Sequence, residues 1–543
     1  MTISRSDVIG TKTVVRRLAE DLAVHTVQGD QTSHLVVRRG RSALIDCHSA
    51  DMRIWLKARE LPAPDLILHT HVQPAHCREA DQFPDARILV HKNLVELASD
   101  RAGYDRASKT TWENPADWPV TMGQERYGVA GSVTDFPPDA LLNLSGNFLE
   151  GDRIAWQDVT FEVIALPGHA RSHVGFAIEL NGEGLAIFTG DLLTSDAKVV
   201  NFYDLEINYG GTALPQLPAV LRSLAKRSET TYFPSTGPAI EDGPTQALKL
   251  ADGIDAYHEA LHWQSGLFTP ITQPDYPSFG RYRQIHRGVY QINNFGNCIV
   301  LIDDSGRGLM IDPGPCDFES PARIQDFHRD LDLLQRDCGL RTIDLALITH
   351  FHGDHYDLLP ELQKRYPNCR VAAHELVARV IESPDDFPYA ARLPWYNVGF
   401  DRVTVDRVLR EKEPFDWHGI AIETIHLPGH CYCHGGHLLT FNGKRLAITG
   451  DAIQTRGESS TIDFIISNHS IPGDQAGNLK SHRQLLAREI DLNLGGHGSN
   501  FTHCGEVYLE SCRRIEHALP YLRNLVPNDD LTGAFFRPGF PKW

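Results

Sequence analysis

Short apolar runs alternate along this chain with segments of helical period, and polar side chains follow directly after several of the runs. The run Leu345–Ile348 has the length of a buried strand and leads into Thr349–His355. Apolar residues at steps of three and four predict a closing helix in the first half, and a similar one in the second: Ala247, Leu250, Ile254, Tyr257 and Leu261; Tyr508, Leu509, Ile515, Leu519 and Leu522. Strands that alternate with helices in this way predict layered α/β domains.

The chain carries the same series of sequence blocks twice. The spacing between blocks is kept, since His169 precedes Asp191 by 22 positions and His430 precedes Asp451 by 21. Because five blocks recur in one order, we interpret the chain as two copies of one domain, 1–268 and 277–543. The matching blocks are Ala43–Asp46 with Gly308–Asp312, Leu68–His76 with Leu347–His355, Pro167–His173 with Pro428–His434, Thr189–Asp191 with Thr449–Asp451, and Ser235–Gly237 with Gly496–Gly498.

Composition narrows the classes of partner. The 543 residues are 41% hydrophobic and 22% charged, as in ordinary globular proteins. The formal charge of −18 disfavours a nucleic-acid partner, whose phosphates are neutralised by Lys and Arg. No apolar run approaches the roughly 18 residues of a membrane span, and the ten cysteines form no Cys-x-x-Cys pair. We therefore expect a cytoplasmic protein with a small-molecule substrate and no membrane contact; the sequence leaves homo-oligomer formation open.

The segment that follows Leu345–Ile348 carries the chemistry. It holds three imidazoles and a carboxylate within the six residues from His350 to His355. A turn leaving a buried strand can hold such side chains rigidly around metal ions, and this mixture suits zinc and other borderline first-row cations. Two cations roughly 3.5–4 Å apart, bridged by a carboxylate, lower the pKa of a shared water toward neutrality. Hydrolysis of a small ester, lactone, thioester or phosphodiester is the reaction we expect.

The blocks together resemble the metallo-β-lactamase superfamily. The residues that carry the resemblance are the motifs His-x-His-x-Asp-His at 350–355, Pro-Gly-His at 428–430, Thr-Gly-Asp at 449–451 and Gly-His-Gly at 496–498. It covers essentially the whole chain, once per half, and implies two tandem αββα sandwich domains with a metal site at one edge of the two sheets. The residues Tyr356–Leu358 depart from the Gly-Gly seen in many glyoxalase II-like and lactonase-like members.

The resemblance also implies a set of site residues in the second half. They would hold two divalent metal ions, with zinc favoured and iron or manganese as alternatives. Asp354 and Asp451 would be catalytic, Asp312 would order the histidine loop through hydrogen bonds, and His434 would support or line the site, or only fix its turn. The ligands would be His350, His352 and His430 for one metal, Asp354, His355 and His497 for the second, and Asp451 for both.

The first half lacks part of this set. Gln73, Ala75 and Thr236 stand where the second half has two histidines and an aspartate. We therefore predict a non-catalytic first domain that serves as a scaffold or binding module. His71, His76, His169 and Asp191 remain, and a weak mononuclear site on His71, His169 and Asp191 is the alternative.

Other readings stay open for the second half. An iron-dependent oxygenase of the persulfide-dioxygenase type has the same fold and would use His350, His430 and Asp451 or a similar subset, although the complete ligand set favours hydrolysis. A nuclease is another member class, which the acidic balance disfavours. Candidate substrate-binding aromatics are Phe351, Trp395 and Tyr396, and core packing is the alternative role for them.

Overall fold

A computed structural model gives the fold of two compact units, Met1–Glu259 with Tyr521–Asp529 and Ala260–Pro520 with Asp530–Trp543. The predicted domain limits at 268 and 277 flank residues outside the described ranges, so they stay a prediction. The residues that the structure describes are 12–28, 32–47, 52–72, 74–77, 79–100, 141–170, 172–200, 213–261, 263, 276–292, 296–314, 322–383, 402–431, 433–455, 462–463 and 475–525.

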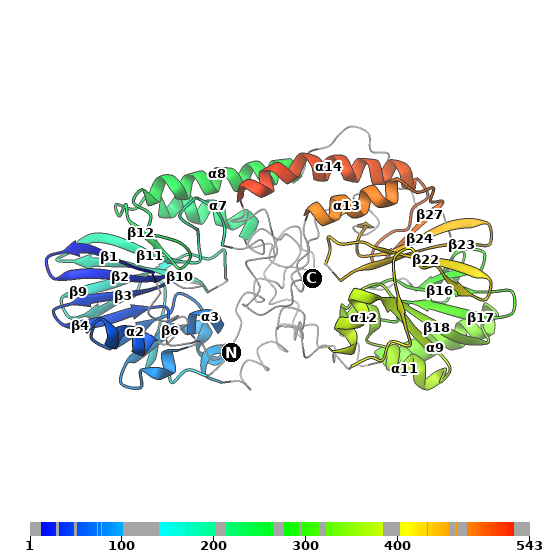
Figure 1. Cartoon of the computed structure of the whole chain (residues 1–543), viewed down its shortest axis with the longest axis horizontal. Coiled ribbons are helices and arrows are strands. Elements are labelled where there is room, and N and C mark those ends of the chain that lie inside the picture. The colour runs from blue at the N-terminus through cyan, green and yellow to red at the C-terminus, as the bar shows by residue number, and fades with distance from the viewer. Residues whose placement is uncertain are drawn as a thin grey trace. The chain divides into compact units, whose positions relative to one another are not determined.

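Two sheets form the described part of the first unit. One has the order β1 to β7, antiparallel up to β4 and parallel from β4 onward: β1 Lys12–Ala19, β2 Leu22–Gln28, β3 Thr32–Arg38, β4 Arg41–Ile45, β5 Pro64–Leu68, β6 Arg87–His91 and β7 Gly146–Phe148. The other has the order β12-β11-β10-β9-β8: β8 Arg153–Trp156, β9 Val159–Ala165, β10 Val174–Leu180, β11 Glu183–Gly190 and β12 Tyr232–Pro234. Helices cover both outer faces (Figure 1): α2 Met52–Ala58, α3 Pro74–Cys77, α4 Val95–Ser99, α7 Ala213–Leu224 and α8 Gly243–Leu261.

The second unit repeats this plan within its described residues. Its first sheet again changes from antiparallel to parallel pairing, here at β17: β13 Ser278–Phe279, β14 Tyr282–His286, β15 Val289–Ile292, β16 Cys298–Ile302, β17 Arg307–Ile311, β18 Thr342–Ile348, β19 Arg370–His374 and β20 Arg407–Leu409. Its second sheet has the order β21-β22-β23-β24-β27: β21 Phe415–Trp417, β22 Ile420–His426, β23 Gly435–Phe441, β24 Lys444–Gly450 and β27 Leu492–Gly495. A short pair, β25 Gln454–Thr455 and β26 Ile462–Asp463, follows β24. The helices are α9 Arg323–Asp337, α10 Gly353–Tyr356, α11 Leu359–Arg365, α12 Glu375–Glu382, α13 Gln475–Leu486 and α14 Cys504–Leu525.

Strand β18 shows why the apolar run before the histidine segment is continuous. Leu345 and Leu347 belong to the core between the two sheets, whereas Ala346 and Ile348 pack in the core beneath the helices. Successive side chains of a strand point to opposite faces, so a strand covered on both faces is apolar at every position. The predicted αββα sandwich is therefore confirmed.

The two closing helices agree with the predicted pattern except at one position. Ala247, Leu250, Ile254 and Tyr257 are buried on α8, and Tyr508, Ile515, Leu519 and Leu522 are buried on α14. Leu509 lies on the predicted helix but is 38% exposed, at the edge of its buried face. Adjacent residues lie about 100° apart around a helix, and Tyr508 already occupies the buried direction. The side chain of Leu261 lies outside the described part of the structure. None of the described helices has the length and apolar character needed to cross a membrane.

Candidate metal centre

Asp312 organises the loop that carries most of the histidines. Strands β17 and β18 are parallel neighbours, so their carboxyl ends meet at one sheet edge, with Asp312 following the first and Thr349 the second. The Asp312 carboxylate accepts hydrogen bonds from the Thr349 backbone N–H at 2.8 Å and from Thr349 Oγ1 at 2.7 Å, and it lies 3.0 Å from His355 Nδ1. Asp312 itself has a left-handed φ of 51°. The carboxylate thus fixes both the start and the end of the histidine segment.

These contacts determine which nitrogen His350 presents to the site. The Thr349 hydroxyl gives its proton to Asp312, so its oxygen accepts from His350 Nδ1 at 3.0 Å. A neutral imidazole carries one proton, and His350 Nε2 is therefore left as a lone pair. Burial and the neighbouring imidazoles hold the pKa of both His350 and His352 well below the usual histidine value, which keeps them neutral.

A first group of donor atoms surrounds this lone pair. His350 Nε2 lies 2.9 Å from His352 Nδ1, which lies 3.1 Å from His430 Nε2. His430 Nε2 is also 3.4 Å from Asp451 Oδ2. One atom from each of these four side chains lies within 4.8 Å of the others, and all four residues are buried. The structure thus brings together the residues that were predicted to bind one metal.

A second group lies on the other side of Asp451. His497 Nε2 is 3.1 Å from Asp354 Oδ2 and 3.2 Å from Asp451 Oδ2, and His355 Nε2 is 3.4 Å from Asp451 Oδ1. Asp354, His355 and His497 also form a group within 4.8 Å. Asp451 therefore turns an oxygen toward each set of histidines, as a bridging ligand would.

The charges of the centre are suited to cations. Burial opposes protonation of His497, but the carboxylates of Asp451 and Asp354 outweigh it and raise its pKa to about 10. Burial likewise opposes the ionisation of Asp354, yet His355 and His497 hold its pKa below the usual value. His355 Nε2 and Asp451 Oδ1 are buried and lie 3.4 Å apart, and neither has a well-formed hydrogen bond. Such atoms are costly unless a further group satisfies them, and this donor set fits divalent cations.

His434 supports Asp451 from behind. Its Nε2 accepts a hydrogen bond from the Asp451 backbone N–H at 3.1 Å, and its ring stacks on that of His350 with centroids 4.8 Å apart. Burial holds the pKa of His434 well below the usual value, consistent with a neutral acceptor. The contact explains why the Pro-Gly-His block continues to a further histidine in both halves.

Of the aromatic candidates for substrate binding, only Phe351 lies within the described residues. Its side chain is 1% exposed and belongs to the core beneath the helices. Core packing is therefore its observed environment, and contact with a substrate stays a prediction. Trp395 and Tyr396 lie outside the described residues.

The sequence did not indicate the steric role of Gly496 or the contribution of Asn297. Gly496 precedes His497, and a Cβ there would lie 2.2 Å from Asp451 Oδ1 and 2.8 Å from His355 Cε1. Asn297 donates through Nδ2 to the carbonyl oxygens of Gly495 and Gly498 at 3.0 and 3.1 Å. It therefore grips the loop of His497 on both sides. Strand register places Thr32 of the first half at the matching position, a correspondence that only the structure supplies.

The first unit keeps the hydrogen bonds that fix the histidine loop but has a different group of donor atoms. Asp46 accepts from the Thr70 backbone N–H at 2.9 Å and from Thr70 Oγ1 at 2.8 Å. His76 Nε2, however, lies 2.8 Å from Asp191 Oδ2, so an imidazole contacts this carboxylate directly. The donor group within 4.8 Å consists of His71, His76 and Asp191, with His76 in place of the predicted His169. His169 Nε2 lies 3.7 Å from Asp191 Oδ2.

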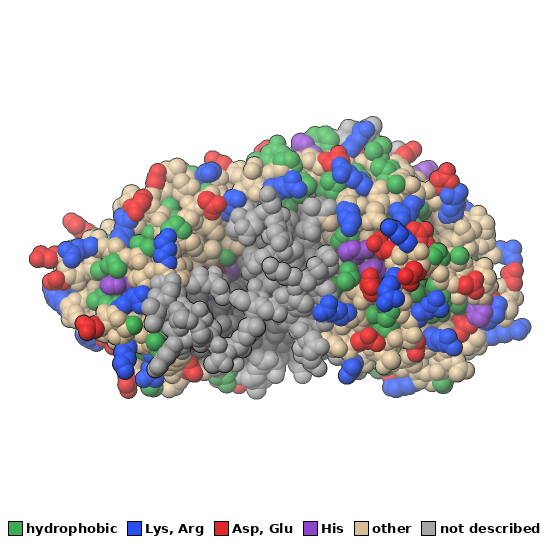
Figure 2. Space-filling model, viewed as in Figure 1, with side chains coloured by type: hydrophobic (Ala, Val, Ile, Leu, Met, Phe, Trp, Pro, Cys, Tyr) green, Lys and Arg blue, Asp and Glu red, His purple; other side chains and the backbone are tan. Residues whose placement is uncertain are grey.

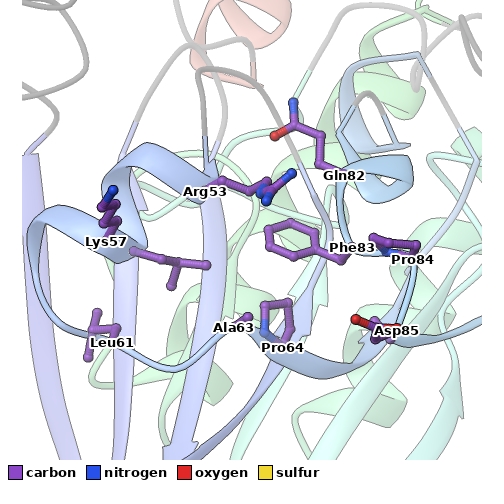
Figure 3. Close-up of a pocket in the computed structure, with 11 residues that line it drawn as sticks. Arg53, Lys57, Leu61, Ala63, Pro64, Gln82, Phe83, Pro84 and Asp85 are labelled. Carbon is purple, nitrogen blue, oxygen red and sulfur yellow. The ribbon is translucent and has the colours of Figure 1, made fainter.

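A separate pocket opens in the first unit between α2 and residues 82–86 (Figure 3). It encloses about 330 Å³, and Arg53 and Lys57 lie above an apolar floor that includes Phe83 and Pro64. None of its lining residues belongs to either histidine cluster. We therefore assign it no part in the chemistry of the metal centre.

The second half of the chain is similar to known protein families. The metallo-beta-lactamase superfamily profile matches residues 293–497. A hydroxyacylglutathione hydrolase of Stenotrophomonas maltophilia is 28% identical over 158 residues, which cover 29% of this chain and 46% of that protein. The hydroxyacylglutathione hydrolase GloC of Haemophilus influenzae is 29% identical over 209 residues, 38% of this chain and 87% of that protein. The chain thus spans about half the length of the first of these relatives.

Solved structures give similar matches. A Cronobacter sakazakii metallo-beta-lactamase with a HARLDQ motif aligns with a TM-score of 0.36 and 20% identity, over 45% of this chain and 95% of that one. The subclass B3 metallo-beta-lactamase BJP-1 of Bradyrhizobium japonicum aligns with a TM-score of 0.34 and 17% identity, over 45% of this chain and 94% of that one.

Proposed function

Since residues 293–497 of this chain belong to the metallo-beta-lactamase superfamily, we propose that its second unit is a metal-dependent hydrolase of small thioesters. The observation that carries the proposal is the position of Asp451 between two groups of donor atoms. Oδ2 lies 3.4 Å from His430 Nε2, and Oδ1 lies 3.4 Å from His355 Nε2. A single carboxylate that lies between two groups of donor atoms can bridge the two metals of a dinuclear centre.

The side chains of the site have distinct parts in this proposal. His350, His352 and His430 are held neutral by burial and offer lone pairs to one cation. Asp354, His355 and His497 would hold the second. Two divalent cations bound here, with zinc favoured over iron or manganese, would supply Lewis acidity and water activation at neutral pH.

Asp354 has a further role in the proposal. It is 6% exposed, and its carboxylate is ionised because His355 and His497 lower its pKa. An ionised carboxylate can orient a water molecule and accept its proton during hydrolysis. Asp354 and Asp451 are therefore the proposed catalytic residues.

The substrate class comes from the relatives. Both curated relatives described above are hydroxyacylglutathione hydrolases, whose name denotes cleavage of an acylated glutathione. A small thioester is accordingly favoured over the ester, lactone and phosphodiester alternatives. On the face shown in Figure 2, basic side chains are interspersed with acidic ones in both units, and no continuous basic patch is visible among the described residues. The formal charge of −18 supports a small-molecule substrate over a nucleic acid.

The test combines metal analysis with a substrate panel. We expect zinc-loaded protein to release thiol from a hydroxyacylglutathione thioester faster than it cleaves a lactone, a carboxylic ester or a phosphodiester. Oxygen consumption by iron-loaded protein with a persulfide, in the absence of thioester cleavage, would contradict the proposal in favour of an oxygenase. Preferential cleavage of RNA would instead support a nuclease.

A further inference from the structure

A buried series of hydrogen bonds, called the polar chain below, runs from α14 through α13 to the turn that carries Asp451. Ser511 Oγ on α14 lies 2.5 Å from His482 Nδ1 on α13, and His482 Nε2 lies 2.8 Å from the carbonyl oxygen of Ala452. Both side chains are 0% exposed. None of the three residues is among the proposed metal ligands, so the chain is an additional feature of this unit.

The direction of each hydrogen bond follows from the chemistry of the groups. The Ala452 carbonyl can only accept, so His482 Nε2 carries the proton and donates it. Burial lowers the pKa of His482 to about 4, and the ring is therefore neutral at pH 7. Its Nδ1 must then accept from the Ser511 hydroxyl. The hydrogen bonds of the polar chain therefore all run in one direction, from the Ser511 hydroxyl through the His482 ring to the Ala452 carbonyl.

With the polar chain, the backbone around Asp451 is hydrogen-bonded on both sides. On the amino side, the Asp451 N–H donates to His434 Nε2 at 3.1 Å. On the carboxyl side, the next carbonyl, that of Ala452, accepts from His482. The preceding residue of α13, Ser481, donates to the Pro428 carbonyl at 2.5 Å, in the turn before His430. Helix α13 therefore holds two turns that present proposed ligands.

The first unit lacks the polar chain although it has the same scaffold. Gly429 and Asn478, which approach closely in the second unit, follow Gly168 and Leu217 of the first by 261 positions each. The helices α14 and α8 begin at Cys504 and Gly243, again 261 positions apart. At this offset His482 corresponds to Leu221 and Ser511 to Leu250, and both leucines are 0% exposed.

The fold does not depend on the polar pair His482 and Ser511. A buried pair of leucines closes the same place in the first unit, so the fold does not require polar groups there. Burying a hydroxyl and an imidazole costs free energy that hydrogen bonds only partly offset, whereas apolar side chains gain from burial. The polar pair occurs in the unit that has the complete ligand set.

We propose that His482 and Ser511 are positioning residues that orient Asp451 for metal binding, an inference that rests on the proposed function. Neither is a proposed metal ligand. They act through the peptide between Ala452 and Ile453, the second one after Asp451, and they are comparable to the outer partners that fix metal-ligating side chains in other centres.

The first unit itself supplies the variant for the test. His482→Leu with Ser511→Leu copies Leu221 and Leu250. We expect the metal-free double variant to unfold at a denaturant concentration equal to or above that of the wild type. Its zinc dissociation constant, measured by competition with a chelator, should rise about tenfold to a hundredfold, and the absorption spectrum of the cobalt-loaded protein should change. Wild-type zinc affinity and an unchanged cobalt spectrum would overturn the proposal.

A pair of single variants keeps the proposal testable if the double variant does not fold. In His482→Gln the amide nitrogen can replace Nε2 and donate to Ala452, whereas in His482→Asn the shorter amide cannot reach that carbonyl. Zinc affinity should be kept by glutamine and lost with asparagine, and equal affinities would contradict the role. A wild-type chain that binds no zinc would refute the proposed function, an outcome distinct from zinc binding that is insensitive to His482.

Discussion

Asp312 Oδ2 lies 3.0 Å from His355 Nδ1, and the ring of His355 turns its other nitrogen toward Asp451. The matching pair in the first unit, Asp46 and His76, has its atoms 3.3 Å apart. One carboxylate therefore orients the same imidazole in both units. On the far side of that imidazole, Nε2 lies 3.4 Å from Asp451 Oδ1 in the second unit and 2.8 Å from the matching Asp191 Oδ2 in the first, so the two units differ in how closely the second carboxylate approaches.

The two aspartates provide a matched pair of variants. We expect Asp312→Asn and Asp46→Asn each to lower the free energy of unfolding by on the order of 1–3 kcal/mol, because each leaves part of a buried hydrogen-bond network unsatisfied. Only Asp312→Asn should also weaken zinc binding, by about tenfold to a hundredfold. Denaturant unfolding and chelator competition measure the two effects. An equal loss of zinc affinity in Asp46→Asn would place a metal in the first unit.

Asp451 should determine the metal content of the whole chain. We expect about two zinc ions per wild-type chain and nearly none in Asp451→Ala, because its two oxygens serve both donor groups. His71→Ala, in the first unit, should leave the metal content unchanged. Elemental analysis of protein dialysed against metal-free buffer is the measurement, and a loss of one metal on His71→Ala would contradict the non-catalytic reading of that unit.

Metal binding should release protons. In the metal-free protein the pKa of His497 is raised to about 10 and that of His355 is well above the usual value, so both rings are protonated at pH 7. A ligand nitrogen must be deprotonated, and zinc therefore displaces about two protons per chain, with affinity that falls as pH falls. Calorimetric titration in buffers of different ionisation enthalpy counts the protons. Proton-neutral binding would show that these rings are not ligands.

Asn297 should matter to the loop of His497. Its side chain donates to Gly495 and Gly498, whereas at the matching position the backbone N–H of Thr32 donates to Ser235 at 2.8 Å. In Asn297→Thr we expect about a tenfold weaker second zinc site, with stepwise zinc titration separating the two sites. The reciprocal Thr32→Asn variant is the control and should bind zinc as the wild type does. Equal weakening of both sites would point to a general loss of structure.

Asp330 predicts a pH dependence of stability that is independent of the metals. Its side chain on α9 is buried, neither oxygen has a hydrogen-bond partner, and Arg281 Nε is 3.5 Å away. Burial raises its pKa to about 6, while Arg281 and Arg329 oppose the rise and Asp326 favours it. The folded state therefore binds this proton more tightly than the unfolded state, and stability falls as pH rises from about 4 to 6.

The variant Asp330→Asn removes this titration. We expect it to raise the free energy of unfolding at pH 7 by on the order of 1 kcal/mol and to leave it nearly unchanged at pH 4. Urea unfolding at the two pH values measures the difference. A stabilisation that is equal at both would show that the carboxyl group does not titrate in this range.

The sequence alone contained the strand-ending motifs, the order of the blocks and the residue types of the ligands. Those features are local: a strand covered on both faces must be apolar, and the turn that leaves it carries the polar side chains, as β18 and His350 show. The recurring blocks also indicated the duplication. They led to the expectation that the first half lacks a complete set of metal ligands.

Tertiary structure decided the contacts that join distant segments. Packing places Asn297 against a loop about 200 residues later, His482 against Ala452, and His76 instead of His169 in the donor group of the first unit. It also directs Leu509 to solvent and places the Asp451 carboxylate within 3.4 Å of His430, His355 and His497. Hydropathy and spacing do not predict such contacts, because each contact depends on the angle at which whole sheets and helices pack. The choice of ligand types is therefore a property of the sequence, and their orientation is a property of the fold.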